Sequence, residues 1–488
     1  MHRADDTPEA HNLLLTVVTA FVLVIFAPML VFPEDPVPIS FAFLAQFAVV
    51  AYAGTRLSML IGRGQPMWYD TMFYAFAYVW MGLAGWAQVT SGKNPFHITH
   101  QPASQEIAAM ITLVGMFSYD VGRVLSRRRA SHGRSAAQPR LPRRLDRRRV
   151  WLLVVVSFVV TPLLIAKQGG WGSFLMPVNL HFAELTARGL YTPDSNVVGS
   201  LVESIARVLP FVALVAMLRL SQARPELRRR PAWWASVLAL GLLNAITSNP
   251  VSSPRFWAGT VLLGLLLSTR WSVRRIGYRT IVCALLGSLI IFFPYADYFR
   301  NANPTYQQKA VSDFLVNKLD YDAPAQMVNA VDYRREIGGT DGRQLLGAMM
   351  FWVPRSVWPD KPGATGPLLG RFINASFLNI SSPLWLETYL DGGYLLTILL
   401  FGGLGAVAAR IDSQMDPRRR SGPTDLAIFA LPVLSVHSII MLRGSLLSNM
   451  GVFVVLAGTI LLVTKRVRVP DSVTNPPAAT RLPSPAAS

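Results

Sequence analysis

The 488-residue chain is 52% hydrophobic and only 15% charged, a composition that excludes an ordinary soluble protein. Its net charge of +19 would suit a nucleic-acid partner, but the densest basic run lacks the interleaved aromatic residues on which bases stack. The basic residues instead flank apolar blocks of near-spanning length, as they do in the cytoplasmic loops of helical membrane proteins. We therefore expect an all-α polytopic membrane protein that contacts anionic membrane lipids and no nucleic acid.

The apolar blocks predict about twelve transmembrane helices. They lie at residues 13–32, 39–61, 70–89, 107–125, 150–166, 198–218, 233–247, 256–269, 280–295, 393–409, 426–442 and 451–464. The first block ends without a small-residue cleavage site, so we expect it to be retained rather than removed as a signal peptide. Residues 127–149 hold ten arginines and one acid. With the amino terminus inside, this run and the other strongly basic connections all lie in the cytoplasm.

This topology divides the chain into six regions. They are an N-terminal four-span region at 1–125, a basic cytoplasmic loop at 126–149, a central five-span region at 150–295, a large extracytoplasmic loop at 296–392 between spans nine and ten, a C-terminal three-span region at 393–469 and a disordered cytoplasmic tail at 470–488. The large loop is too long for a plain connection. Long loops on a compact scaffold commonly carry function, so we expect the site there.

The large loop has predicted order of its own. Asp322 and Pro324 are placed as the N-cap and first turn of a helix, which Gly338 and Gly339 would end. The apolar stretch 344–353 is too short to span, so it predicts a helix lying on the membrane.

The segment 354–362, Pro-Arg-Ser-Val-Trp-Pro-Asp-Lys-Pro, follows. Its three prolines predict a stiff, extended backbone. Such a segment would present Arg355, Trp358 and Lys361 to an anionic, sugar-bearing ligand. The alternative is a rigid strut that packs the loop onto the helices.

Several arginines fall in segments predicted to lie outside, against the positive-inside rule. They are Arg188, Arg255, Arg300, Arg334, Arg335, Arg343, Arg355, Arg371 and Arg443. For Arg334, Arg335 and Arg371 we expect solvation or pairing with nearby acids. The others predict a positive external cleft that could clamp a diphosphate through charge-assisted, bidentate bonds without a metal.

Ionisable residues within or beside the spans are further candidates. His437 lies inside the eleventh span, where a neutral histidine bonded to a neighbouring helix is the alternative to a functional role. Glu387 lies just above the tenth span and could act as a base or pair with an arginine. Glu203 and Arg207 predict an internal ion pair. The single cysteine, Cys283, excludes a disulfide framework within one chain.

The segment 354–362, followed by Glu387-Thr388-Tyr389-Leu390-Asp391-Gly392-Gly393, resembles the signature of bacterial O-antigen (Wzy-type) oligosaccharide repeat-unit polymerases. The resemblance implies a glycosyltransferase of GT-C-like architecture in the bacterial plasma membrane, with its site on the extracytoplasmic side. Such an enzyme polymerises undecaprenyl-diphosphate-linked repeat units without a metal or other cofactor. A repeat-unit flippase and a chain-length regulator are its implied partners.

The resemblance also implies roles for particular residues. The diphosphate would be bound or neutralised by Arg255, Arg300, Arg343, Arg355 and Arg443. Lys361 would assist, Trp358 and Tyr389 would contact substrate, and Glu387 or His437 would be the base. Arg355, Glu387 and Tyr389 occupy motif positions, whereas His437 and Arg443 are proposed from topology.

Three alternatives stay open. An O-antigen ligase would share the donor and deliver the glycan to another acceptor. A lipid-phosphate-sugar transferase would use carboxylates in the first external loop, where Glu34 and Asp35 lie. A transporter of lipid-linked or anionic substrates would be expected to show internal repeats and broken helices, and the sequence has no convincing repeat.

Overall fold

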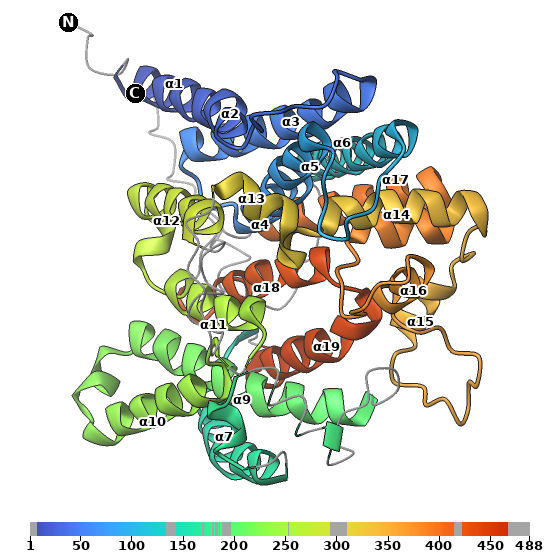
Figure 1. Cartoon of the computed structure of the whole chain (residues 1–488). Helices are drawn as coiled ribbons and strands as arrows, with labels where there is room; N and C mark the ends of the chain where they lie inside the picture. The colour runs from blue at the N-terminus through green and yellow to red at the C-terminus, as the bar shows by residue number, and fades with distance from the viewer. Residues whose placement is uncertain are drawn as a thin grey trace, which may run out of the picture.

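The computed structural model describes residues 7–132, 143–167, 170–177, 180, 184, 186–187, 197–251, 253–292, 310–413 and 422–466. Figure 1 shows that these residues form a bundle of helices. The first part comprises α1 (Thr7–Phe21), α2 (Ala27–Leu30), α3 (Phe41–Arg63), α4 (Trp68–Phe76), α5 (Gly85–Ser91), α6 (Pro102–His132) and α7 (Arg147–Lys167). The middle comprises α9 (Val197–Ala223), α10 (Pro231–Thr247), α11 (Arg255–Leu267), α12 (Arg275–Gly287), α13 (Val311–Asn317), α14 (Ala323–Glu336), α15 (Arg343–Met349) and α16 (Thr365–Phe372). The last part comprises α17 (Leu384–Ser413), α18 (Leu426–Arg443) and α19 (Leu446–Leu462).

The predicted membrane class is confirmed, although the number of crossings is not. In the part of the chain that the structure describes, eight helices are long and apolar enough to cross a membrane. The shorter apolar helices are α10, α11 and α19. Between α4 and α5 the chain continues as a π-helix, η2 (Ala77–Ala84), so residues 68–91 form one helical stretch. Each of the twelve predicted spans therefore overlaps a helical segment, although several helices end within a few residues of the predicted bounds, and residues 293–295 lie outside the described residues.

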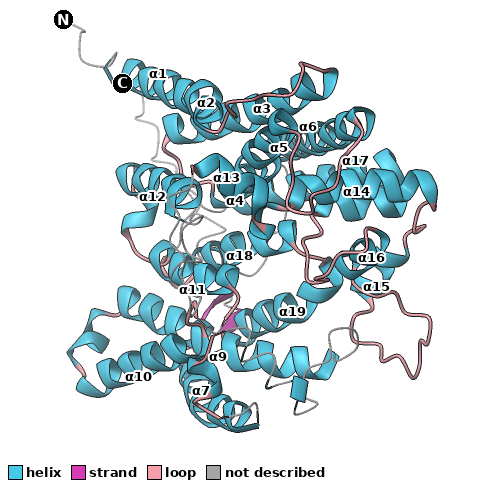
Figure 2. Ribbon diagram, in the orientation of Figure 1, coloured by secondary structure: helices cyan, strands magenta, loops and turns pink. Residues whose placement is uncertain are grey.

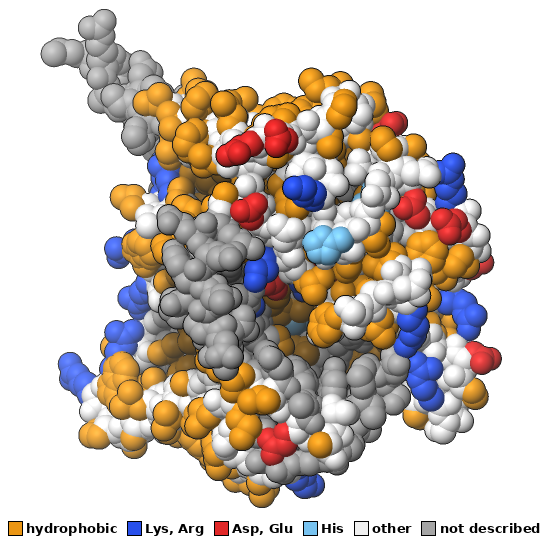
Figure 3. Space-filling view, viewed as in Figure 1, with side chains coloured by type: hydrophobic (Ala, Val, Ile, Leu, Met, Phe, Trp, Pro, Cys, Tyr) orange, Lys and Arg blue, Asp and Glu red, His pale blue; other side chains and the backbone are white. Residues whose placement is uncertain are grey.

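Local sequence signals explain where helices begin and end. The Ser40 hydroxyl accepts a bond from the amide of Phe43 and caps the start of α3. Gly64 ends the helix in the left-handed conformation, at φ 62°, which glycine adopts without a Cβ penalty. Large apolar side chains remain exposed along helices such as α1 and α7 and cover much of the surface in Figure 3, as expected of surfaces that face lipid.

Helices α6 and α17 form the closest helix pair and lie side by side in Figure 1. Glycines make this approach possible: a Cβ on Gly122 would collide with the carbonyl of Gly402, and one on Gly405 with the carbonyl of Tyr119. Small residues at such crossings let helix backbones pack directly in membrane proteins.

Helix ends that the sequence places on one side of the membrane contact one another. Strand β1 (Arg143–Leu145) pairs antiparallel with β2 (Thr464–Arg466), as Figure 2 shows in magenta. The Arg144 guanidinium also binds Asp425 at 2.9 Å, and Arg279 donates to the carbonyl of Ile61 at 2.9 Å. All of these segments are predicted to be cytoplasmic, so the contacts agree with the predicted alternation of the chain.

The described part of the large loop is mostly helical, with α13 to α16 in it. The helix predicted after Asp322 is confirmed as α14, and the one predicted over 344–353 is the shorter α15. The prediction of an extended segment at 354–362 is wrong. Turns form there, because the amides of Val357 and Trp358 both donate to the carbonyl of Pro354. The tenth predicted span begins at a break in α17, where Gly393 has a φ of 60°.

Candidate functional site

Two of the predicted outer arginines, Arg255 and Arg443, converge on one short turn, η8 (Leu319–Tyr321). Arg255 begins α11, and its Nη1 lies 2.7 Å from Oδ2 of Asp320. Arg443 ends α18, and its Nη2 donates to the carbonyl oxygen of Leu319 at 3.3 Å. The Arg443 guanidinium also lies over the ring of Phe256, 4.6 Å from its centroid. Two helices and the large loop therefore meet at one charged cluster.

Two carboxylates complete this cluster. Asp320 keeps 26% of its side chain exposed, whereas Asp322 is fully buried. Asp322 Oδ1 lies 3.6 Å from Nη2 of Arg443, and Oδ2 accepts a bond from the Ser381 amide at 2.9 Å. Burial raises the pKa of Asp322, and the charge of Arg443 opposes that shift. We call Arg255, Asp320, Asp322 and Arg443 the arginine–aspartate cluster.

Glu387 lies nearby but is engaged in holding helices together. Its Oε1 accepts a bond from the Thr365 hydroxyl at 2.7 Å, and its Oε2 accepts one from the amide of Leu446 at 3.0 Å. Leu446 is the first residue of α19, so the carboxylate satisfies an amide that no helical carbonyl can reach. The turn from Arg443 to Leu446 therefore connects Glu387 with the arginine–aspartate cluster.

Asp391, one turn further along α17, also accepts hydrogen bonds from backbone amides at the start of a helix, in this case α15. Its carboxylate accepts bonds from the amides of Gln344 and Leu345 in the first turn of α15, at 3.2 and 2.6 Å. It also accepts a bond from the Thr340 hydroxyl at 2.5 Å. The acids of the Glu387–Asp391 motif thus position α15 and α19.

The segment 354–362 is tied mainly to itself. The exposed Arg355 donates to the carbonyl of Lys361 at 2.7 Å. The Lys361 ammonium donates to the carbonyls of Phe351 and Val353 at 2.6 and 2.9 Å, and burial lowers its pKa, followed by the charge of Arg355. Arg343 donates to the Asp360 carbonyl at 2.9 Å, and Trp358 is half-buried. These contacts make the loop a compact unit.

The remaining candidates are spread through the structure. His437 is buried and stacks 6.3 Å from Phe453, and within the described residues neither ring nitrogen has a hydrogen-bond partner. The predicted pair of Glu203 and Arg207 is present at 2.7 Å. Tyr389 packs under the guanidinium of Arg334, 5.3 Å from its ring centroid. Arg300 lies outside the described residues, as does Arg188.

Arg334, for which solvation or pairing with an acid is expected, is half-buried and binds backbone carbonyls instead. Arg334 donates to the carbonyls of Tyr389 and Leu390 at 2.6 and 2.8 Å, because α14 packs across the end of the first half of α17. Sequence reasoning also missed Asp320 and gave Asp322 only a helix-capping role. The signal was available in Leu319-Asp320-Tyr321-Asp322, which places two acids next to a predicted helix start in an arginine-rich loop.

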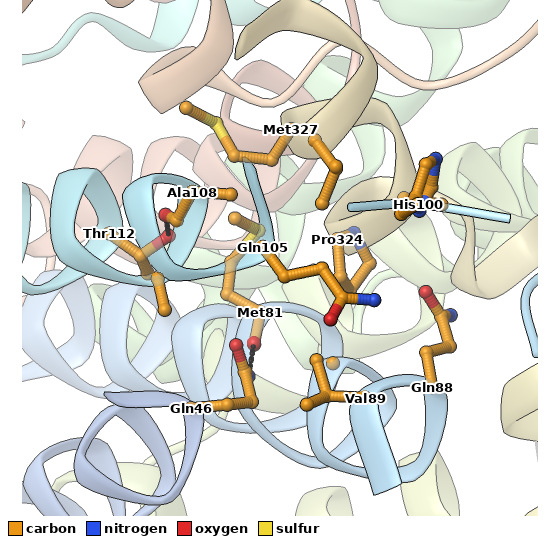
Figure 4. A pocket seen from close by; sticks show the side chains of 14 residues that line it. Gln46, Met81, Gln88, Val89, His100, Gln105, Ala108, Thr112, Pro324 and Met327 are labelled. Carbon is orange, nitrogen blue, oxygen red and sulfur yellow. Dashed lines mark hydrogen bonds between the residues drawn. The ribbon is translucent and has the colours of Figure 1, made fainter. Parts of the chain in front are cut away.

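A separate pocket lies between α3, η2, α5, α6 and α14 (Figure 4). Gln46, Gln88, Gln105 and His100 line it, together with apolar side chains. Its volume is about 20 Å³, far below the roughly 300–1,000 Å³ of ordinary ligand sites. This pocket has room for water but none for a sugar. Figure 3 shows a hollow near the middle of the face that it draws, in the region where Figure 1 draws α18.

Among the described residues, no group of three or more His, Cys, Asp or Glu side chains is arranged to hold a metal ion. Compared with known proteins, the chain matches no family model, no curated protein and no solved structure.

Proposed function

We propose that the chain is a membrane glycosyltransferase that polymerises lipid-diphosphate-linked oligosaccharide repeat units. It would have about twelve spans and act on the outer face of the bacterial plasma membrane. The proposal rests on the motif resemblance and on one structural observation, the convergence of Arg255 and Arg443. These arginines lie in segments predicted to be outside, where orientation signals do not account for them.

The arginine–aspartate cluster has groups that could bind the diphosphate of a lipid-linked oligosaccharide. Guanidinium groups bind phosphate oxygens through paired N–H bonds and stay charged at all physiological pH values. Asp320 and Asp322 hold the two guanidinium groups before substrate arrives. A bound diphosphate would compete with the carboxylates for those N–H groups, and the raised pKa of Asp322 lowers the cost of protonating it then.

The proposed reaction breaks the bond between the anomeric carbon of the growing glycan and the diphosphate oxygen. The lipid diphosphate leaves with the bonding electrons, and Arg255 and Arg443 stabilise its charge. A hydroxyl oxygen of the second repeat unit forms the new bond to the anomeric carbon. The hydroxyl proton passes to a base, so atoms and charge balance.

We assign the base to Asp320. Its carboxylate is partly exposed and belongs to the arginine–aspartate cluster. Glu387 is the weaker candidate, because both of its oxygens already accept bonds from Thr365 and Leu446. We give Glu387 a positioning role, since it fixes the turn that follows Arg443.

The test uses purified protein in nanodiscs with the lipid-diphosphate-linked repeat unit of its own host. Wild type is expected to produce a ladder of polymer on a gel. Arg255→Ala and Arg443→Ala are expected to lower the rate at least about a hundredfold, as loss of a transition-state donor does. Arg335→Ala is the matched control and should behave like wild type, because Arg335 is exposed on α14 and makes an exposed hydrogen bond to Gln101 at 3.5 Å.

The product distinguishes the alternatives. A single transfer to another acceptor, without a ladder, would make the chain a ligase that uses the same donor site. Full activity in both arginine variants would refute the proposed site. If only Arg355→Ala loses activity, the site would instead be assigned to the segment 354–362.

A further inference from the structure

Helix α14 carries a stripe of polar side chains on a face that is buried. Asp322 precedes the helix, and Gln326 and Asn329 follow at intervals of four and three residues, so the three share one face. Their exposed fractions are 0%, 0% and 2%. The apolar residues Pro324, Met327 and Val331 occupy the opposite face.

Other buried polar groups gather at the Asp322 end of this stripe. The Ser381 amide donates to Asp322 at 2.9 Å, and the amide of Ser382 donates to the carbonyl oxygen of Arg443 at 2.9 Å. Both serine side chains are buried. Arg443, with 20% of its side chain exposed, connects this group to the surface and to the arginine–aspartate cluster.

Many polar atoms of these side chains lack a hydrogen-bond partner within the described part of the chain. They are Gln326 Oε1, Gln326 Nε2, Asn329 Nδ2, Ser382 Oγ and Arg443 Nε. Each such buried group destabilises the folded state when it is left unpaired. Native proteins keep few of them, and a concentration in one place needs a specific reason.

We infer that Asp322, Gln326, Ser381, Ser382 and Arg443 form a binding site for one sugar ring of the lipid-linked substrate, an inference that rests on the proposed function. The unpaired atoms comprise amide groups, a hydroxyl and a guanidinium donor, and the Asp322 carboxylate lies beside them in its contact with Arg443. That mixture matches the hydroxyl groups of a sugar, each of which donates and accepts. One carboxylate is too few for a metal cage. The diphosphate would lie next to the sugar at Arg255 and Arg443.

The test compares two soluble probes on full-length protein in nanodiscs without glycolipid. One is a short-chain prenyl diphosphate that carries one N-acetylhexosamine, and the other is the same prenyl diphosphate without sugar. Wild type should bind the sugar-bearing probe more tightly. Gln326→Met should weaken the binding of the sugar-bearing probe about three- to tenfold, the effect of losing one or two hydrogen bonds. Its affinity for the sugar-free probe should stay unchanged.

Stability gives a second readout. Gln326→Met replaces an unpaired buried amide by an apolar side chain of similar size, so it should preserve or raise the melting temperature of the unliganded protein. The matched control is Gln46→Met, because Gln46 is also buried but donates to the carbonyls of Met81 and Gly82. This control should lower the melting temperature and keep the preference for the sugar-bearing probe.

The outcomes separate the two proposals. Equal binding of both probes to wild type would refute the sugar site and leave the diphosphate clamp standing. Binding of neither probe would overturn both. A destabilised Gln326→Met protein with an unchanged preference for sugar would show that the amide holds structural water, and would refute the sugar site.

Discussion

The side chain of Glu387 connects α16, α17 and the start of α19 through two hydrogen bonds. Glu387→Ala removes the acceptor of the Leu446 amide and leaves the buried Thr365 hydroxyl only the longer contact with Gln344 Oε1 at 3.5 Å, so we expect a loss of about 2–3 kcal/mol in the free energy of unfolding. Glu387→Gln keeps one acceptor oxygen and should lose less. Thermal denaturation in detergent measures both effects.

Glu336→Ala is the control for this prediction, because Glu336 is exposed at the end of α14. Its stability should match wild type. A Glu387→Ala protein that is as stable as wild type but inactive would contradict the positioning role and favour Glu387 as the base.

The side chain of His100 is expected to make the stability of the folded protein depend on pH. Its Nε2 lies 2.9 Å from Oδ1 of Asn329, and burial lowers its pKa below the ordinary 6.5, although Asn329 and Asp332 oppose the shift. The unfolded chain therefore takes up the proton at a higher pH than the folded protein. This contribution to stability is present above pH 6.5 and is lost as the pH falls through the lowered folded value.

We therefore expect the melting temperature of wild type to fall more steeply than that of His100→Gln between about pH 7 and about pH 5. Glutamine retains a donor for Asn329 but does not titrate in this range. Parallel curves for the two proteins would show that His100 is protonated equally in both states, contrary to the prediction.

At the scale of elements, the contact between α6 and α17 depends on glycines. Gly405→Ala places a methyl group against the carbonyl of Tyr119 and forces the two helices apart. We expect a loss of about 1–3 kcal/mol in the free energy of unfolding. Gly403→Ala is the matched control two residues earlier, where a Cβ meets nothing within 4 Å.

Gly403→Ala should leave stability unchanged or raise it, because alanine favours the helix. The melting temperatures of the two variants therefore separate the effect of helix packing from that of helix propensity. Equal melting temperatures would mean that α6 and α17 are not closely packed at Tyr119.

For the whole molecule, the sidedness of the helices can be measured with cysteine labelling. Cys283→Ser removes the single native cysteine. In that background Ser356→Cys, in the large loop, should react with a membrane-impermeant maleimide on intact cells. Ala232→Cys, at the exposed start of α10, should react only after the membrane is opened. The reverse pattern would invert the predicted topology and place the arginine–aspartate cluster in the cytoplasm.

The sequence by itself determined the membrane class and the positions of most helical segments, and it predicted which helix ends share one side of the membrane. These properties depend on local hydrophobicity and on the basic residues next to it. The sequence also predicted Arg255 and Arg443 as site candidates, because arginines in outer segments run against the orientation signal. It did not predict the turns at 354–362, since three prolines restrict the backbone without choosing between turns and an extended chain.

Only the tertiary structure decided which charges meet. Arg255 binds an acid 65 residues away, and Arg443 binds a carbonyl 124 residues away. The same holds for Glu387 and Asp391, whose carboxylates cap helices that the sequence does not pair with α17. The buried polar stripe of α14 is another example, because its spacing is visible in the sequence but its burial is not. Such contacts arise from how helices pack against one another, and that packing depends on the shape of every side chain at the crossing.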